Sequence, residues 1–263
     1  MPTIRRDGVE LFYQVSGNGP EVVLLHPFPL NHHFWDAIVP QLTTRYRVLT
    51  SDLRAHGASD AGYGPVTMQK LADDLEHLLR EERIVKAFFV GVSIGGYALF
   101  EFWRRNRERV AALVLANTRA GAETAEGRAN RLRIADEVVR DGTAGFIEDL
   151  LTKLLGATTR TNRPDIVDAA RRMMQQMSPQ DIAGVQRGMA DRPDSIPTLT
   201  TINVPALVIA GEEDSVPISE GELMRDRISG SRLVMIDRVG HYAAMEKPGE
   251  FGSLLREFLD KMR

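Results

Sequence analysis

One serine of the chain stands in a pattern that suits nucleophilic chemistry. The residues from Gly91 to Gly95 read G-V-S-I-G, which matches the pattern G-x-S-x-G with Ser93 at its centre. An apolar run, 87–93, leads into the pattern, and a helical pattern, 94–106, follows it. In that context the serine lies on a sharp strand-to-helix turn, where the flanking glycines leave room for the close backbone. The turn holds the hydroxyl near a helix N-terminus, where negative charge is favoured.

A serine hydroxyl is a poor nucleophile unless a base activates it and a third group orients that base. For a serine on such a turn, an acid and then a histidine follow later in the chain. Asp214 lies just past the apolar run 206–211, and His241 lies just past the run 232–237. Because open α/β sheets carry their sites at the carboxyl ends of strands, both side chains are expected beside Ser93.

The elements that must position these residues alternate along the chain. Six apolar runs are too short for helices and are apolar on both faces, as strands of a parallel sheet should be. They cover residues 22–26, 47–52, 87–93, 110–118, 205–214 and 232–237. Helical patterns lie between them, at 68–79, 94–106 and 248–262. The alternation predicts an α/β fold with a doubly wound, mostly parallel sheet.

One region breaks this alternation. Residues 119–195 contain no convincing strand, and we expect them to form a helical cap inserted between two strands. The core then consists of residues 1–118 and 196–263. Helical patterns of the cap lie at 128–142, 144–156, 165–177 and 178–190.

The composition excludes several classes of protein. The 263 residues carry a formal net charge of −3, which gives no basic excess for a nucleic-acid partner or a membrane surface. Cysteine is absent, so disulfides and thiolate chemistry are excluded. No signal-peptide segment or membrane-length apolar run is present, so a cytoplasmic protein is expected. The sequence leaves open whether the chain forms a homo-oligomer.

Four parts of the chain together resemble the α/β-hydrolases. The resemblance is to the small, single-cap group of esterases, enol-lactonases and haloperoxidase-like perhydrolases, and it covers nearly the whole chain. It rests on LLHPFPLNHHFWDAIVPQL, DLRAHGASD, GVSIGGYAL, and the pair GEEDSVP and GHYAAMEKPGEF. The resemblance implies that Ser93 is the nucleophile, His241 the general base and Asp214 its orienting acid. No metal or other cofactor is expected.

Other acids compete with Asp214 for this role. Glu212 and Glu213 directly precede it, but the family position is the last acid before the S-V-P turn, which favours Asp214. Some relatives place the acid after the fourth apolar run instead, where this chain has Asn117. We expect Glu246 to be a surface or salt-bridge residue.

Two backbone N–H groups are expected to bind the oxyanion of a tetrahedral intermediate. One belongs to Ile94, directly after the serine. The second comes from the loop after the first apolar run, where relatives have His-Gly and this chain has His26 followed by Pro27. Proline has no N–H, so the resemblance points to Phe28, two positions after the histidine. Since Phe28 precedes Pro29, it is also biased to an extended backbone, which would help to pre-set its N–H.

Several side chains are expected to bind the substrate. They are Phe28, Trp35 and Tyr97 from the core, with Phe146 and Met174 from the cap, although plain helix packing also explains the cap residues. Such an apolar pocket suits a small aliphatic or aromatic ester. Arg119, after the fourth apolar run, could bind a substrate carboxylate as an enol-lactonase would need, but a surface ion pair is the expected role.

These observations favour a serine hydrolase that cleaves a small carboxylic ester or lactone through an acyl-enzyme. The same triad would serve a C–C bond (diketone) hydrolase or a cofactor-free perhydrolase. A non-catalytic small-molecule-binding protein on the same fold is an alternative of another class. His26, His32 and His33 could instead suggest a metal site, but their spacing matches no known metal motif and only one acid lies near them. The segment 52–56 is expected to hold a loop by internal hydrogen bonds.

Overall fold

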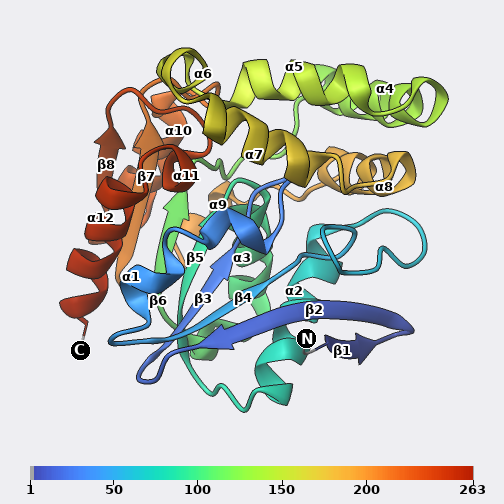
Figure 1. Ribbon diagram of the computed structural model, residues 1–263. Helices are drawn as coiled ribbons and strands as arrows, with labels where there is room; N and C mark the ends of the chain where they lie inside the picture. Colours follow the sequence, from blue (N-terminus) through green and yellow to red (C-terminus); the bar gives the residue numbers. More distant parts are fainter. Residues whose placement is uncertain (1–2, 263) are drawn as a thin grey trace.

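A computed structural model describes residues 3–262 and contains one eight-stranded sheet with helices on both faces (Figure 1). The strand order is β1-β2-β4-β3-β5-β6-β7-β8. β1 and β2 form an antiparallel hairpin, β2 is antiparallel to β4, and all later neighbours are parallel. The strands are β1 (Thr3–Arg6), β2 (Val9–Ser16), β3 (Glu21–Leu25), β4 (Arg47–Ser51), β5 (Ala87–Val92), β6 (Val110–Ala116), β7 (Ala206–Gly211) and β8 (Arg232–Ile236). The predicted doubly wound, mostly parallel sheet is confirmed.

Helices cover both faces of the sheet because the central strands are apolar on both sides. In β3, Val23 and Leu25 face one core, and Val22 and Leu24 face the other. The first core packs α2 (Met68–Glu81), α3 (Ile94–Asn106) and α10 (Ile218–Arg227) against the sheet; the second packs α1 (Val39–Leu42) and α12 (Pro248–Asp260). We call these the α2/α3 core and the α1/α12 core. The short helices are η1 (His32–Trp35), η2 (Arg107–Arg109), α9 (Ile196–Leu199) and α11 (Ala243–Glu246).

Five of the six helices between β6 and β7 lie above the carboxyl ends of the strands (Figure 1). They are α4 (Ala125–Asp141), α5 (Ala144–Leu154), α6 (Ala157–Asn162), α7 (Pro164–Met174) and α8 (Pro179–Ala190). Each of the four helical patterns forms a helix, and α6 is an additional one. A capping box between Ser178 and Asp181 begins α8. The division of the chain at residues 119 and 195 stays a prediction.

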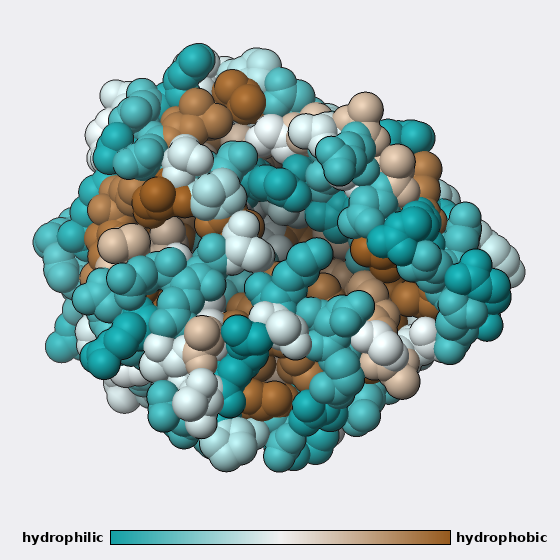
Figure 2. All heavy atoms as spheres, turned by 90° about the horizontal axis from the view of Figure 1, so that it is seen from above, coloured by the Kyte–Doolittle hydropathy of each residue, from teal (hydrophilic) through white to brown (hydrophobic). Residues whose placement is uncertain are grey.

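The cap packs on the core rather than standing apart from it. Side chains of α8 belong to the α2/α3 core, and side chains of α5 and α7 belong to the α1/α12 core. Viewed from above, the molecule is mostly hydrophilic, and its hydrophobic residues form separate patches (Figure 2). Within residues 3–262, no helix has the length and apolar composition of a membrane span.

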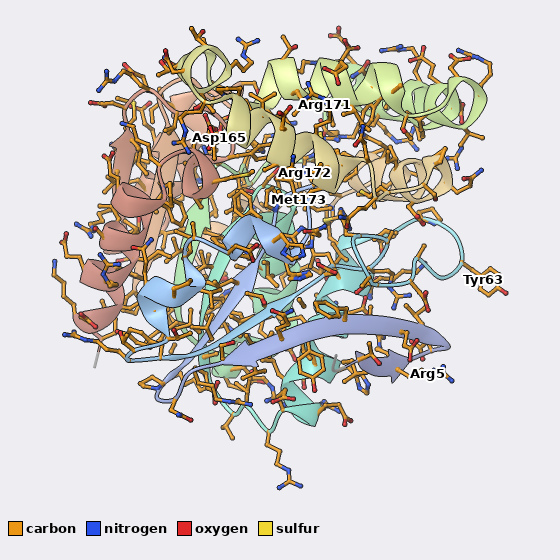
Figure 3. All side chains as sticks on the ribbon, viewed as in Figure 1. Arg5, Tyr63, Asp165, Arg171, Arg172 and Met173 are labelled. Atoms are coloured by element: carbon orange, nitrogen blue, oxygen red, sulfur yellow. The ribbon has the colours of Figure 1, made fainter. Side chains whose placement is uncertain are left out.

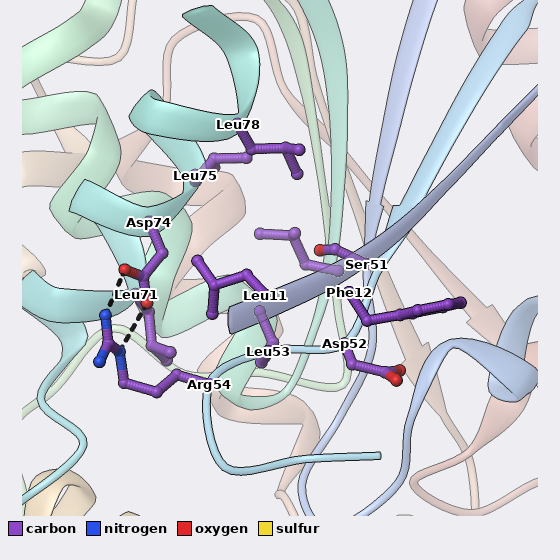
Figure 4. A pocket seen from close by; sticks show the side chains of 11 residues that line it. Leu11, Phe12, Ser51, Asp52, Leu53, Arg54, Leu71, Asp74, Leu75 and Leu78 are labelled. Atoms are coloured by element: carbon purple, nitrogen blue, oxygen red, sulfur yellow. Dashed lines mark hydrogen bonds and ion pairs between the residues drawn. The ribbon is translucent and has the colours of Figure 1, made fainter. Parts of the chain in front are cut away.

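The loop after β4 is held by internal hydrogen bonds, as the sequence predicted. Asp52 accepts the N–H groups of His32 and Ala58 at 2.7 and 2.8 Å. Arg54 forms two hydrogen bonds with Asp74 of α2, at 2.6 and 2.8 Å, beside a small apolar cavity (Figure 4). These residues therefore fix the loop on α2.

Candidate active site

The structure places Ser93 on a sharp turn between β5 and α3. Its backbone has φ 54° and ψ −115°, a conformation that is rare for a residue with a side chain. The turn is held by hydrogen bonds, because the Ser93 N–H donates to Ala116 O at 3.0 Å and the Thr118 hydroxyl donates to Ser93 O at 2.8 Å. The side chain is 9% exposed. Packing and hydrogen bonding around Ser93 thus offset the backbone strain at this one residue.

The two flanking glycines are required by the space around this turn. A Cβ on Gly91 would lie 2.6 Å from the carbonyl carbon of Gly95. A Cβ on Gly95 would lie 2.6 Å from Leu25 O, since β3 and β5 are neighbours here. Any larger residue at either position would push the turn away from the sheet.

Asp214 and His241 form a hydrogen-bonded pair at the carboxyl ends of β7 and β8. His241 Nδ1 lies 2.9 and 3.0 Å from the two carboxylate oxygens of Asp214. The same carboxylate accepts the Val216 N–H at 3.0 Å and the Asn117 amide at 2.8 Å. Burial raises the pKa of the Asp214 carboxyl, but the charge and hydrogen bond of His241 and the other donors outweigh burial and lower that pKa. The carboxylate therefore stays ionised at neutral pH and orients the imidazole.

Glu212 and Glu213, the two acids that compete with Asp214, have partners other than His241. Glu212 accepts the Arg238 N–H at 2.8 Å, and Glu213 accepts the N–H and hydroxyl of Thr158 at 2.8 and 2.5 Å. Neither carboxylate contacts the His241 ring in the described part of the chain.

Glu246 was expected to be a surface or salt-bridge residue, and this expectation is wrong. The side chain is 4% exposed, and its carboxylate accepts the N–H groups of Gly240 and Tyr242, at 3.0 to 3.1 Å. These are the two residues that flank His241. Glu246 therefore fixes the backbone on both sides of the histidine, a role that the sequence did not indicate.

The same carboxylates anchor the cap to the site. Glu246 also accepts the Gly156 N–H at 3.0 Å and the Thr159 hydroxyl at 2.6 Å, at the start of α6. Glu213 binds Thr158 between them. The loops that carry Asp214 and His241 are thereby tied to one short cap helix.

Ser93 and His241 line one cavity of about 450 Å³ beneath the cap. Because Asp214 pairs with His241 Nδ1, the predicted role of this histidine as a base would fall to Nε2. Within residues 3–262 the Ser93 hydroxyl makes no hydrogen bond, to this ring or to any other group. Without substrate, catalytic hydrogen bonds of this kind are often long and tighten only when substrate binds.

Of the two expected oxyanion donors, Ile94 directly follows Ser93, and Phe28 lines the same cavity as Ser93. Ile94 is the first residue of α3, and Phe28 lies in the loop after β3 and lines the cavity. Among the described residues, neither N–H donates to another group of the chain. The Phe28–Pro29 peptide bond is cis, and the Tyr242 hydroxyl donates to Phe28 O at 3.3 Å.

Three of the five expected substrate-binding residues line the cavity: Phe28, Tyr97 and Phe146. Other apolar residues of the wall are Ile134, Leu150, Leu154, Met189 and Val216. Most of them come from α4, α5 and α8 of the cap. The cap therefore supplies most of the apolar residues of the cavity, and polar and charged side chains line the rest of it.

The other two expectations, Trp35 and Met174, are wrong. Both side chains are 0% exposed in the α1/α12 core, and neither lines the cavity. Trp35 packs against Phe251 of α12, with ring centroids 6.2 Å apart. Met174 lies on the buried side of α7; Figure 3 shows the neighbouring Met173 and Arg171 on opposite sides of that helix. Helix packing, the alternative interpretation, accounts for both residues.

The three clustered histidines have separate partners. His26 Nδ1 donates to Pro27 O at 3.0 Å, and its Nε2 accepts the Leu53 N–H at 2.9 Å. His32 and His33 pair with Asp52 and Asp36. Within residues 3–262, no group of three or more His, Cys, Asp or Glu side chains is arranged to hold a metal ion.

His26 is expected to make the fold sensitive to acid. Burial lowers the pKa of His26 from 6.5 to about 3. Between these values the unfolded chain binds a proton that the folded chain does not, so the free energy of unfolding falls as the pH falls. The loss is about 2 kcal/mol between pH 6.5 and pH 5. Burial also lowers the pKa of His56, which acts in the same direction.

Urea unfolding of the wild type and His26→Asn from pH 7 to pH 4 measures this effect. The variant should be less stable at pH 7 and lose less stability on acidification, whereas the exposed His33→Asn should follow the wild type. Equal pH slopes for His26→Asn and the wild type would contradict the assignment.

Comparison with known proteins identifies the family of the chain. A family model described as the alpha/beta hydrolase fold matches residues 20–248. The chain belongs to the alpha/beta hydrolase family. The 3-oxoadipate enol-lactonase 1 of Acinetobacter baylyi is 28% identical over 261 residues, which cover 98% of this hydrolase and 96% of the relative.

Solved structures agree with this membership. A thermophilic esterase from Thermogutta terrifontis is 36% identical with a TM-score of 0.94, covering 99% of this hydrolase and 97% of the esterase. The enol-lactonase from Burkholderia xenovorans LB400 is 27% identical with a TM-score of 0.92, covering 98% of this hydrolase and 100% of that chain.

Proposed function

We propose that this hydrolase cleaves a small carboxylic ester or lactone, with Ser93 as nucleophile, His241 as general base and Asp214 as its orienting acid. One observation carries the proposal. Ser93 stands on a strained turn in the same cavity as a histidine whose other ring nitrogen is held by an ionised carboxylate. Nucleophile, base and orienting group are the three parts that activated-serine chemistry needs.

The reaction begins when Ser93 Oγ attacks the substrate carbonyl and His241 Nε2 takes the hydroxyl proton. The N–H groups of Ile94 and Phe28 bind the oxyanion of the tetrahedral intermediate, each worth about 10²- to 10³-fold in kcat. His241 then protonates the leaving alkoxide, and the acyl group stays on Ser93. His241 then deprotonates a water molecule that attacks the acyl-enzyme, and it returns the proton to Ser93 Oγ as the acid leaves. With a lactone, the alkoxide that leaves belongs to the same molecule.

The size and lining of the cavity support a small substrate. A volume of about 450 Å³ lies within the range of pockets that enclose small molecules. The similar proteins include an enol-lactonase and an esterase, which supports an ester or lactone as the bond that is cleaved.

A panel of substrates tests the proposed reaction. Initial rates are measured with p-nitrophenyl esters, lactones, a vinylogous diketone, and acetate with peroxide. We expect the highest kcat/KM among the esters and lactones. A kcat/KM that is highest for the diketone would favour a C–C hydrolase, and the highest activity with peroxide would favour a perhydrolase. Activity with none of them would favour a binding protein.

A further inference from the structure

Arg119 lies beside the nucleophile. It follows β6 and lines the same cavity as Ser93. The preceding residue, Thr118, donates its hydroxyl to Ser93 O at 2.8 Å. The backbone from which the arginine extends is therefore fixed relative to Ser93. From the sequence, a surface ion pair was the expected role of Arg119 and binding of a substrate carboxylate was the alternative.

Glu123, the ion-pair partner of Arg119, forms shorter contacts with two other arginines. Arg131 Nε donates to Glu123 Oε1 at 2.5 Å, and Arg192 forms a short ion pair with the same oxygen. Arg119 Nη2 lies 3.3 and 3.5 Å from the two oxygens of Glu123. Charge-assisted hydrogen bonds are normally about 2.7–2.9 Å long, so Arg119 is the weakest of the three partners.

Arg119 also has an unused donor. Its Nε is buried without a hydrogen-bond acceptor within residues 3–262, and Tyr97, besides Glu123, interacts with the guanidinium. A buried donor without an acceptor costs folding free energy, which an anionic ligand in the cavity would recover. The Arg119 side chain as a whole is 33% exposed.

Positive charge is in excess around this cavity. Arg119, Arg131 and Lys153 line it, against Glu123 and Glu220. Arg192 adds a further cation behind the wall, where its guanidinium lies 4.5 Å from the centroid of the Tyr97 ring. Lys153, on α5, forms no ion pair with any described residue. Among the charged side chains that line the cavity, cations therefore outnumber carboxylates by one, and Arg192 behind the wall is balanced by the Asp214 carboxylate behind His241.

We propose that the cavity contains an anion subsite centred on Arg119, with Lys153 contributing, and that the preferred ester or lactone carries a carboxylate. The carboxylate accepts from the Arg119 guanidinium while the scissile carbonyl lies at Ser93. The selectivity for charge rests on the proposed function, whereas the binding of a carboxylate ligand does not depend on it.

A matched pair of substrates tests the subsite. The p-nitrophenyl ester of adipic acid carries a free carboxylate, and its methyl ester is neutral at the same position. In the wild type we expect kcat/KM to be at least tenfold higher for the acid than for the methyl ester, because one charge-assisted hydrogen bond is worth about tenfold or more. In Arg119→Gln the ratio of the two kcat/KM values should fall toward unity, mainly because KM for the acid rises. Arg119→Lys should keep part of the preference, and added salt should reduce it in the wild type.

The controls separate the subsite from folding and from catalysis. Arg128→Gln alters an exposed arginine paired with Asp191 outside the cavity and should keep the wild-type ratio. If Arg119→Gln fails to fold, Lys153→Met, on an exposed residue, should still lower the ratio. A wild-type ratio near unity, or one unchanged in the folded variants, would overturn the subsite.

Calorimetric titration with adipate needs no turnover. We expect the affinity to fall at least tenfold in Arg119→Gln, and no binding to the wild type or equal affinities would contradict the subsite. If neither ester is hydrolysed but adipate binds through Arg119, the proposed function fails and the subsite stands.

Discussion

Replacing Ser93 with alanine should lower kcat for an ester substrate by about 10⁴-fold or more. Alanine keeps the Cβ and the backbone strain of the turn but has no oxygen to form the acyl-enzyme. The oxyanion donors and the cavity stay in place, so a small residual rate from water attack is expected. The measurement is steady-state kinetics together with thermal unfolding.

A matched serine variant provides the control. Ser253 lies on α12, where its hydroxyl donates to Gly249 O and accepts from Arg256, both of the same helix. Ser253→Ala should keep wild-type kcat. A Ser93→Ala enzyme within tenfold of wild-type kcat would contradict the role of Ser93 as nucleophile.

Replacing Asp214 with asparagine should lower kcat by about 10³- to 10⁴-fold. In the wild type, the Asp214 carboxylate accepts His241 Nδ1–H, the Val216 N–H and the Asn117 amide. An asparagine amide has no charge to stabilise the imidazolium and can favour the wrong tautomer of the ring. Because both residues have nearly the same shape, folding should change little.

Glu212→Gln is the control for this prediction, because Glu212 is a neighbouring acid that binds the Arg238 N–H instead of the histidine. It should keep kcat within about threefold of wild type. An equal loss in both variants, or a loss only in Glu212→Gln, would mean that the acid had been assigned to the wrong residue.

The sequence was most informative where local geometry decides the outcome. The glycines around Ser93 predicted a sharp turn, and the structure has φ 54° there. The carboxyl ends of apolar runs predicted that Asp214 and His241 would meet, because parallel strands end at one edge of the sheet. Their contact of 2.9 Å depends on β7 and β8 being neighbours.

The sequence was least informative where partners come from distant segments. Glu246 resembles a surface residue by type, and only the fold brings Gly156, 90 positions earlier, to its carboxylate. The same contact explains α6, whose sequence ATTRTN has low helix propensity and which is held by Glu213 and Glu246. Trp35 closely follows the loop that carries Phe28 in the sequence, yet η1 turns the Trp35 ring toward α12.

The central claim is that Ser93 is an activated nucleophile, and covalent labelling tests it most directly. The protein is treated with a fluorophosphonate, digested with trypsin and analysed by mass spectrometry. We predict one label on the peptide 87–104, at Ser93, with no labelling of Ser93→Ala and slow labelling of Asp214→Asn. No label on the folded wild type, or equal labelling of Ser93→Ala, would contradict the account.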